Sequence, residues 1–143
     1  MKNQPMRIYR SCSLAMAATF TAVGLVFLFC PETVLDFFNR LSPQPGLAPA
    51  PVHPGTFFPI LAVAYMYLVT LLAWLMYRKP GNPIFPLLLA QGKFASSILS
   101  LVFFFGGAPY LVCLANAIAD GLIGALVMRL YFLQKKHAAS WPT

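Results

Sequence analysis

Four long apolar stretches constrain the fold of this chain more than any other feature. They cover residues 11–29, 57–77, 84–105 and 110–128, and contain 19, 21, 22 and 19 residues. A helix needs about 20 apolar residues to cross the ~30 Å hydrocarbon core of a bilayer. The stretches are too long for strands, and they lack the alternation of apolar and polar residues that a membrane barrel requires. The sequence therefore predicts an all-α integral membrane protein with four transmembrane helices.

The overall composition agrees with this fold class. Hydrophobic residues make up 59% of the 143 residues and charged residues only 9%, whereas about a quarter of the residues in soluble domains are charged. We expect one membrane domain, residues 1–143, in which the four helices form an antiparallel bundle. The expected spans are about 11–30, 56–78, 83–105 and 109–131.

The start of the chain also fits a second interpretation. A basic segment followed by an apolar run is typical of a secretory signal peptide as well as of a first transmembrane helix. The run at 11–29 is longer than the apolar core of most signal peptides, and no small-x-small cleavage site immediately precedes Pro31. We therefore expect an uncleaved first helix.

The positive charges predict the orientation of the chain. Eight of the ten Lys and Arg residues fall on one side of the expected membrane, whereas Arg40 falls on the other side, beside Glu32 and Asp36. The eight are Lys2, Arg7, Arg10, Arg78, Lys79, Arg129, Lys135 and Lys136. By the positive-inside rule, both termini and the middle loop lie in the cytoplasm. The expected localisation is the cytoplasmic (inner) membrane.

The net charge of +7 bears on the partners of the protein. It follows from the orientation signal and adds attraction to anionic lipid headgroups. No basic face belongs to a folded domain outside the membrane, so we expect no nucleic-acid partner. The expected partners are the lipid bilayer and either another membrane protein or further copies of this chain in a homo-oligomer. We expect no cofactor.

The first outer loop begins with an amphipathic segment. Glu32, Asp36 and Arg40 recur every four residues, and the opposite side is apolar, with Val34, Leu35, Phe38 and Leu41. This pattern predicts a short amphipathic interfacial helix after the first span, lying in the outer headgroup layer. Five prolines in the segment 42–55 then favour an extended loop without regular structure.

Lys93 and Asp120 are the only charged residues deep inside the apolar stretches. Lys93 lies nine residues after Ile84 and Asp120 nine residues before Arg129, so both lie about 14 Å from the cytoplasmic boundary. The short link at 106–109, rich in glycine and proline, makes the third and fourth helices neighbours. Because an unpaired charge at the centre of a membrane helix costs about 2.5 to 3.5 kcal/mol, the sequence predicts a buried ion pair.

Small and polar side chains accompany each member of this pair. Ser96, Ser97 and Ser100 share the helix face of Lys93. The face of Asp120 contains Cys113, Asn116, Ala117 and Gly124. This pattern suggests a narrow polar vestibule that opens to the outer side and ends at the ion pair. The candidate binding residues are Lys93, Asp120, Asn116, Ser97 and Ser100.

The ion pair permits three interpretations. It can hold helices together, as the small-residue ladder Ala117, Gly121 and Ala125 would also do. It can bind an ion, a proton or a polar ligand. It can act in catalysis, although the sequence contains no catalytic triad, carboxylate pair, histidine cluster or phosphate loop. We favour a non-enzymatic accessory or assembly subunit, or a self-associating bundle, with a small carrier as the alternative. No catalytic or metal-binding residue is assigned.

Two further features concern contacts between spans. Gln91 points away from Lys93 and needs a partner, either on the second span or in another subunit. The polar face of the second span contains Tyr67, Thr70 and Trp74. Cys30 and Cys113 lie near the outer ends of the first and fourth spans, so a disulfide is compatible with the topology if these helices touch, and buried free cysteines are the more common alternative.

Overall fold

The computed structural model describes residues 4–51, 58–107 and 109–138 and contains five helices in this part of the chain. The helices are α1 (Gln4–Phe29), α2 (Pro31–Leu41), α3 (Phe58–Arg78), α4 (Ile84–Phe105) and α5 (Leu111–Ala138). All except α2 are long and apolar enough to cross a membrane. The predicted all-α chain with four such helices is therefore confirmed.

The observed helices differ from the expected spans mainly at the two ends of the chain. Helices α3 and α4 begin within two residues of the expected positions. In contrast, α1 begins at Gln4, before the apolar stretch, and α5 continues to Ala138, well beyond it. Arginine and lysine favour helical structure in water. The apolar pattern therefore marks the hydrocarbon-compatible part of each helix and not the whole helix.

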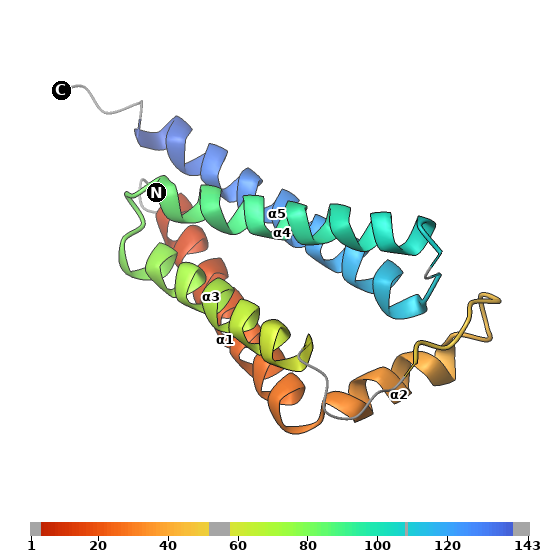
Figure 1. The fold of residues 1–143 in the computed structure, drawn as a ribbon. Coiled ribbons are helices and arrows are strands. Elements are labelled where there is room, and N and C mark those ends of the chain that lie inside the picture. Colours follow the sequence, from red (N-terminus) through yellow and green to blue (C-terminus); the bar gives the residue numbers. More distant parts are fainter. Residues whose placement is uncertain (1–3, 52–57, 108, 139–143) are drawn as a thin grey trace.

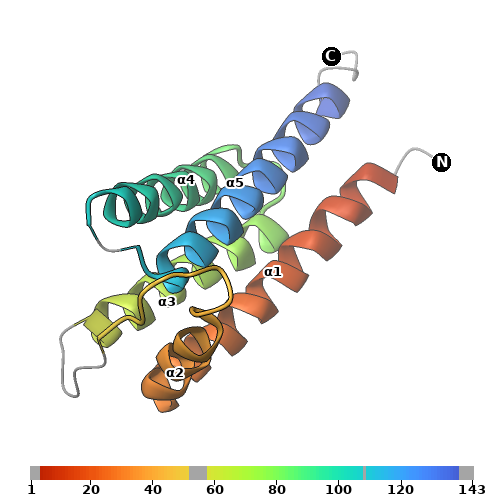
Figure 2. The ribbon, with the colours of Figure 1, turned by 90° about the vertical axis from the view of Figure 1, so that its right-hand side faces the viewer.

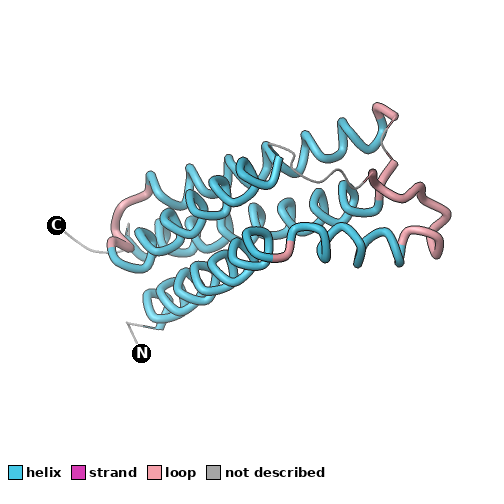
Figure 3. Tube along the Cα trace, turned by 60° about the horizontal axis from the view of Figure 1, so that its bottom comes forward, coloured by secondary structure: helices cyan, strands magenta, loops and turns pink. Residues whose placement is uncertain are grey.

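The four long helices are arranged as two closely packed pairs. Helix α1 packs along α3, and α4 packs along α5, with fewer contacts between the pairs. The start of α1 and the end of α5 lie at the same end of the molecule as the α3–α4 loop, whereas α2 lies at the opposite end (Figures 1 and 3). Figure 2 shows α4 at an edge of the assembly, beside α5. The predicted contact between the third and fourth long helices is present.

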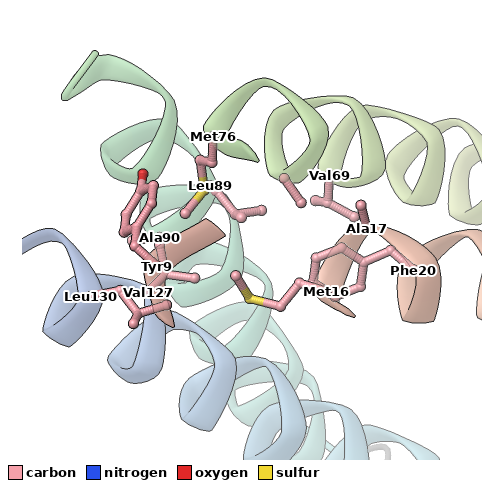
Figure 4. Packing of buried hydrophobic residues seen from close by; sticks show 11 residues of the cluster. Tyr9, Met16, Ala17, Phe20, Val69, Met76, Leu89, Ala90, Val127 and Leu130 are labelled. Atoms are coloured by element: carbon pink, nitrogen blue, oxygen red, sulfur yellow. The ribbon is translucent and has the colours of Figure 1, made fainter. Parts of the chain in front are cut away.

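The buried hydrophobic core joins the two pairs. Its residues come from all four long helices: Tyr9, Met16, Ala17, Phe20, Val69, Ala73, Met76, Leu89, Ala90, Val127 and Leu130. Figure 4 shows these side chains meeting between the helices. Most belong to the half of each helix that lies nearer the α3–α4 loop, and the two pairs diverge towards α2 in Figure 1. Apolar packing therefore joins the pairs mainly at one end.

Helix α2 and the loop after it fold back over the other end. Helix α2 contacts α1 and α5. The Asn39 amide donates a hydrogen bond to the Ala50 carbonyl oxygen at 2.9 Å and accepts one from the Ala50 N–H at 2.7 Å. Ala48 pairs with Tyr110 in an isolated β-bridge. The predicted loop 42–55 is described as far as residue 51, and its remainder lies outside the described residues.

The link between α4 and α5 depends on two glycines. Gly106 donates its backbone N–H to the Val102 carbonyl at 2.8 Å, which ends α4. Gly107 adopts a φ of +114°, a value that favours glycine because it has no Cβ. These two residues allow a short connection, which keeps α4 beside α5 and sets the register of the polar side chains on both helices.

Candidate functional site

The centre of the candidate site is the ion pair between Lys93 on α4 and Asp120 on α5. Lys93 Nζ donates a hydrogen bond to Asp120 Oδ1 at 2.7 Å. Only 1% of Lys93 and 4% of Asp120 is exposed. The predicted buried ion pair is therefore confirmed. In so buried a position each charge depends on the other, since either one alone would lack a counter-charge.

Two aromatic rings complete the surroundings of the Lys93 ammonium. Nζ lies 4.8 Å from the ring centroid of Phe20 and 5.0 Å from that of Tyr65. Both distances fall within the range of cation–π attraction, which strengthens when the cation is shielded from water. Phe20 belongs to α1 and Tyr65 to α3. The four long helices thus meet at one charged group, which connects the α4–α5 pair to the α1–α3 pair.

Neither ring was predicted from the sequence. Depth alone could have suggested them, because Phe20 and Tyr65 lie in the middle parts of α1 and α3. The chain contains 13 Phe and six Tyr residues, however, and an aromatic residue in an apolar stretch carries no sign of which neighbour it contacts. Two opposite charges in apolar stretches stand out in the sequence and predict a pair. An aromatic ring that contacts a cation does not stand out in this way.

A ladder of polar contacts continues from the ion pair along α4 and α5. Ser97 Oγ donates a hydrogen bond to the Ala117 carbonyl oxygen at 2.6 Å. Asn116 Nδ2 donates to Ser100 Oγ at 2.8 Å and to Ser96 Oγ at 3.2 Å. All five predicted site residues therefore lie along one helix interface. The contacts observed for these side chains join α4 to α5. The polar vestibule that these residues were expected to line, opening to the outer side, stays a prediction.

Glycine allows α4 and α5 to approach closely around this ladder. A Cβ atom placed on Gly121 would lie 3.1 Å from Ser97 Oγ, and one placed on Gly124 would lie 2.9 Å from the Phe94 ring. Small residues play this role in many membrane helix pairs. Ala117 is buried in the same interface. Ala125 is exposed, so the predicted ladder of small residues faces α4 only in part.

Buried oxygens at and near the site lack hydrogen-bond partners among the described residues. Asp120 Oδ2 is buried and accepts no hydrogen bond from the residues that the structure describes. The hydroxyl groups of Tyr9 and Tyr65 are also buried without a partner there. A buried polar atom without a hydrogen bond costs about 1 to 3 kcal/mol, unless a water molecule or proton satisfies it. The site therefore has an acceptor that Lys93 does not use.

Of the two partners expected for Gln91, the one on the second span was wrong. Gln91 is exposed and makes no hydrogen bond within the described part of the chain. Tyr67 is 71% exposed, and Trp74 lies near Arg78 at a cation–π distance of 5.9 Å. Tyr65 rather than Tyr67 faces α4, because residues two positions apart on a helix point in very different directions.

The cysteines form no disulfide in the structure. Cys12, Cys30 and Cys113 are free thiols, with Cys30 exposed and Cys113 half-buried. Helix α1 packs mainly on α3 and touches α5 much less, and the disulfide that the topology allowed between Cys30 and Cys113 is not formed. Among the described residues, no group of three or more His, Cys, Asp or Glu side chains could hold a metal ion.

The site therefore offers an ion pair, two covering rings, a polar ladder and one free carboxylate oxygen. No family model, curated protein or solved structure matches this chain. Its function must be inferred from the contacts of these side chains.

Proposed function

We propose that this protein is a multi-pass protein of the cytoplasmic (inner) membrane, with four spans in an antiparallel bundle. Helices α1, α3, α4 and α5 have the required length and apolarity. The start of α1, the end of α5 and the α3–α4 loop lie at one end (Figure 1). That end carries the described cations Arg7, Arg10, Arg78, Lys79, Arg129 and Lys135. By the positive-inside rule, both termini face the cytoplasm.

Helix α2 then lies in the outer headgroup layer. It has no fully buried residue. Glu32, Asp36 and Arg40 are exposed, and the apolar Phe37 is 59% exposed. A helix with charged and apolar surfaces of this kind is suited to the boundary between headgroups and acyl chains. Its contacts with α1 and α5 would hold it over the outer end of the bundle.

The molecule acts as a non-enzymatic accessory or assembly subunit in which the Lys93–Asp120 pair stabilises the bundle. One observation carries this proposal: Lys93 is in contact with Asp120, Phe20 and Tyr65. These contacts are all intramolecular and come from every other long helix. A charge surrounded in this way favours one arrangement of the spans, while the apolar outer surfaces stay free for lipid or for another membrane protein.

Purification from native membranes in a mild detergent tests this function. We expect a membrane protein to copurify in a fixed ratio with the wild type and with the double variant Lys93→Leu/Asp120→Leu. The double variant removes both charges together, so it leaves no unpaired charge in the bundle. Copurification of the wild type with lipid alone would contradict an accessory role with a second protein.

One observation favours a second candidate, a small carrier of protons or polar molecules. Asp120 Oδ2 is buried and has no partner among the described residues, and Ser97, Ser100 and Asn116 continue from it along the interface. In this case the folded double variant would lose transport. A pH-sensitive dye inside liposomes that contain the full chain would show proton movement for the wild type and none for the double variant.

A further inference from the structure

Gln91 is a polar residue on the outer surface of the bundle. It lies on the face of α4 that points away from Lys93, and its side chain is exposed. It is seven residues after Ile84, where α4 begins, and therefore about 10 Å along the helix axis. In the proposed membrane orientation this depth is inside the hydrocarbon core. Lipid offers the amide no hydrogen-bond partner, so exposure there is unfavourable.

The surface around Gln91 has the spacing of a helix-pairing seam. Exposed residues alternate at steps of three and four along α4: Leu88, Gln91, Ala95, Ile98, Val102 and Phe105. This is the spacing of the a and d positions in a left-handed helix pair. Gln91 is the one polar member of the seam. A single polar residue in such a seam fixes the register and the number of helices.

We infer that this face of α4 docks against the same face of a second copy of the chain, with the two Gln91 amides bonded to each other. The inference rests on the proposed membrane-spanning arrangement. Because the charges orient every copy in the same way, the two-fold axis is parallel to the membrane normal. Equivalent residues then lie at the same depth. An amide has both donors and an acceptor, so Gln91 is complementary to its own symmetry mate.

Pairing of Gln91 with Tyr67 of another copy fits less well. Tyr67 is also exposed in the middle of a span, and it lies eleven residues before Arg78. It is therefore about 16 Å from the cytoplasmic end of α3, compared with about 10 Å for Gln91 in α4. In copies with the same orientation these levels differ by about one helical turn. Ala95, next to Gln91 on the seam, lets two α4 helices approach closely.

Cysteine cross-linking in membranes tests the position of the interface. The full chain is prepared with Cys12, Cys30 and Cys113 replaced by Ala, and either Ala95→Cys or Ala119→Cys is added. Both alanines are exposed and lie at similar depth, on α4 and α5 respectively. We expect oxidation to give a covalent dimer with Ala95→Cys and little or none with Ala119→Cys. Equal cross-linking at both positions, or none at position 95, would overturn the inference.

A second measurement tests the amide itself. Dimerisation in liposomes is followed by energy transfer between labelled full-length chains. We expect Gln91→Leu to weaken dimerisation roughly threefold to twentyfold, the range for one interhelical polar contact in a membrane, and Gln91→Asn to keep most of the affinity. An unchanged dimer with Gln91→Leu, or equal weakening by Tyr67→Phe, would overturn the self-pairing of Gln91.

Two controls separate failure of this inference from failure of the proposed function. Thermal unfolding checks that Gln91→Leu and Gln91→Asn are as stable as the wild type, as expected for an exposed position. Alkaline extraction and protease protection check that the chain spans the membrane. A chain that spans the membrane but stays monomeric overturns only the dimer, whereas a chain released at alkaline pH overturns the membrane function and the dimer together.

Discussion

The Lys93 ammonium lies 4.8 Å from the centroid of the Phe20 ring, so a charge on α4 is in contact with the first helix of the chain. This contact joins the α4–α5 pair to the α1–α3 pair at the depth of the ion pair. The ring of Tyr65 on α3 makes a similar contact at 5.0 Å. The ion pair and these rings together explain how an apolar bundle can select one arrangement of its helices.

The Phe20 contact predicts a loss of stability on removal of the ring. Phe20→Leu should lower the free energy of unfolding by about 1 to 3 kcal/mol, through lost cation–π attraction and lost packing. Phe29→Leu is the matched control, because Phe29 is 75% exposed and its change should have little effect. Both values come from denaturation in detergent followed by circular dichroism. Equal effects at the two positions would contradict the role assigned to Phe20.

The effect of Phe20→Leu on stability should depend on the charge of Lys93. In a chain that already carries Lys93→Leu/Asp120→Leu, the effect of Phe20→Leu should fall by about 0.5 to 2 kcal/mol, the part due to cation–π attraction. The remaining effect measures packing alone. If Phe20→Leu costs the same in both backgrounds, the ring packs near Lys93 without stabilising its charge.

The polar ladder predicts a smaller effect at Asn116. Its amide donates hydrogen bonds to Ser96 and Ser100, so Asn116→Ala should destabilise the α4–α5 contact. The expected loss is about 0.6 to 1.7 kcal/mol, from the average to the largest value for interhelical hydrogen bonds in a membrane protein. Ser11→Ala, at an exposed position near the start of α1, is the control. A loss at Asn116 no larger than the loss at Ser11 would show that the ladder adds no stability.

Close packing at Gly124 predicts that an alanine there would clash with Phe94. A Cβ there would lie 2.9 Å from the Phe94 ring, and the ring, which is 37% exposed, would have to move outward from the bundle. We expect Gly124→Ala to reduce the free energy of unfolding by about 1 to 3 kcal/mol. In a chain that already carries Phe94→Ala, Gly124→Ala should cost much less, because the ring that the new Cβ would meet is absent. Gly92→Ala is the control, because its Cβ would meet Tyr65 only at 3.9 Å.

Much of the candidate site could be predicted because charges in hydrocarbon have few alternatives. Lys93 and Asp120 had to be paired, and the short link containing Gly106 and Gly107 made their helices neighbours. The serine stripe and Asn116 followed from helical geometry, and the structure brings these residues together. The number of membrane-compatible helices followed from the lengths of the apolar stretches.

The rest could not be predicted, since apolar surfaces do not identify their neighbours. Apart from their depth, nothing in the sequence distinguishes Phe20 and Tyr65 from the other aromatic residues of the first two long helices. The packing of α1 on α3 likewise depends on how their apolar surfaces fit together, which the sequence does not show. For Gln91 the sequence left two candidate partners, the polar face of α3 and another subunit, and its exposed side chain excludes the contact with α3. Side-chain direction, and not polarity alone, decides which helices meet.

The most direct test of the central claim is a double-mutant cycle on Lys93 and Asp120, measured as the free energy of unfolding in detergent. Lys93→Leu and Asp120→Leu should each lower it by about 3 to 5 kcal/mol, because each leaves a buried charge without its partner. The double variant should lie within about 1 kcal/mol of the wild type, since no charge then remains in the bundle. Losses in the two single variants that simply add in the double variant would contradict the claim that this ion pair stabilises the bundle as a unit.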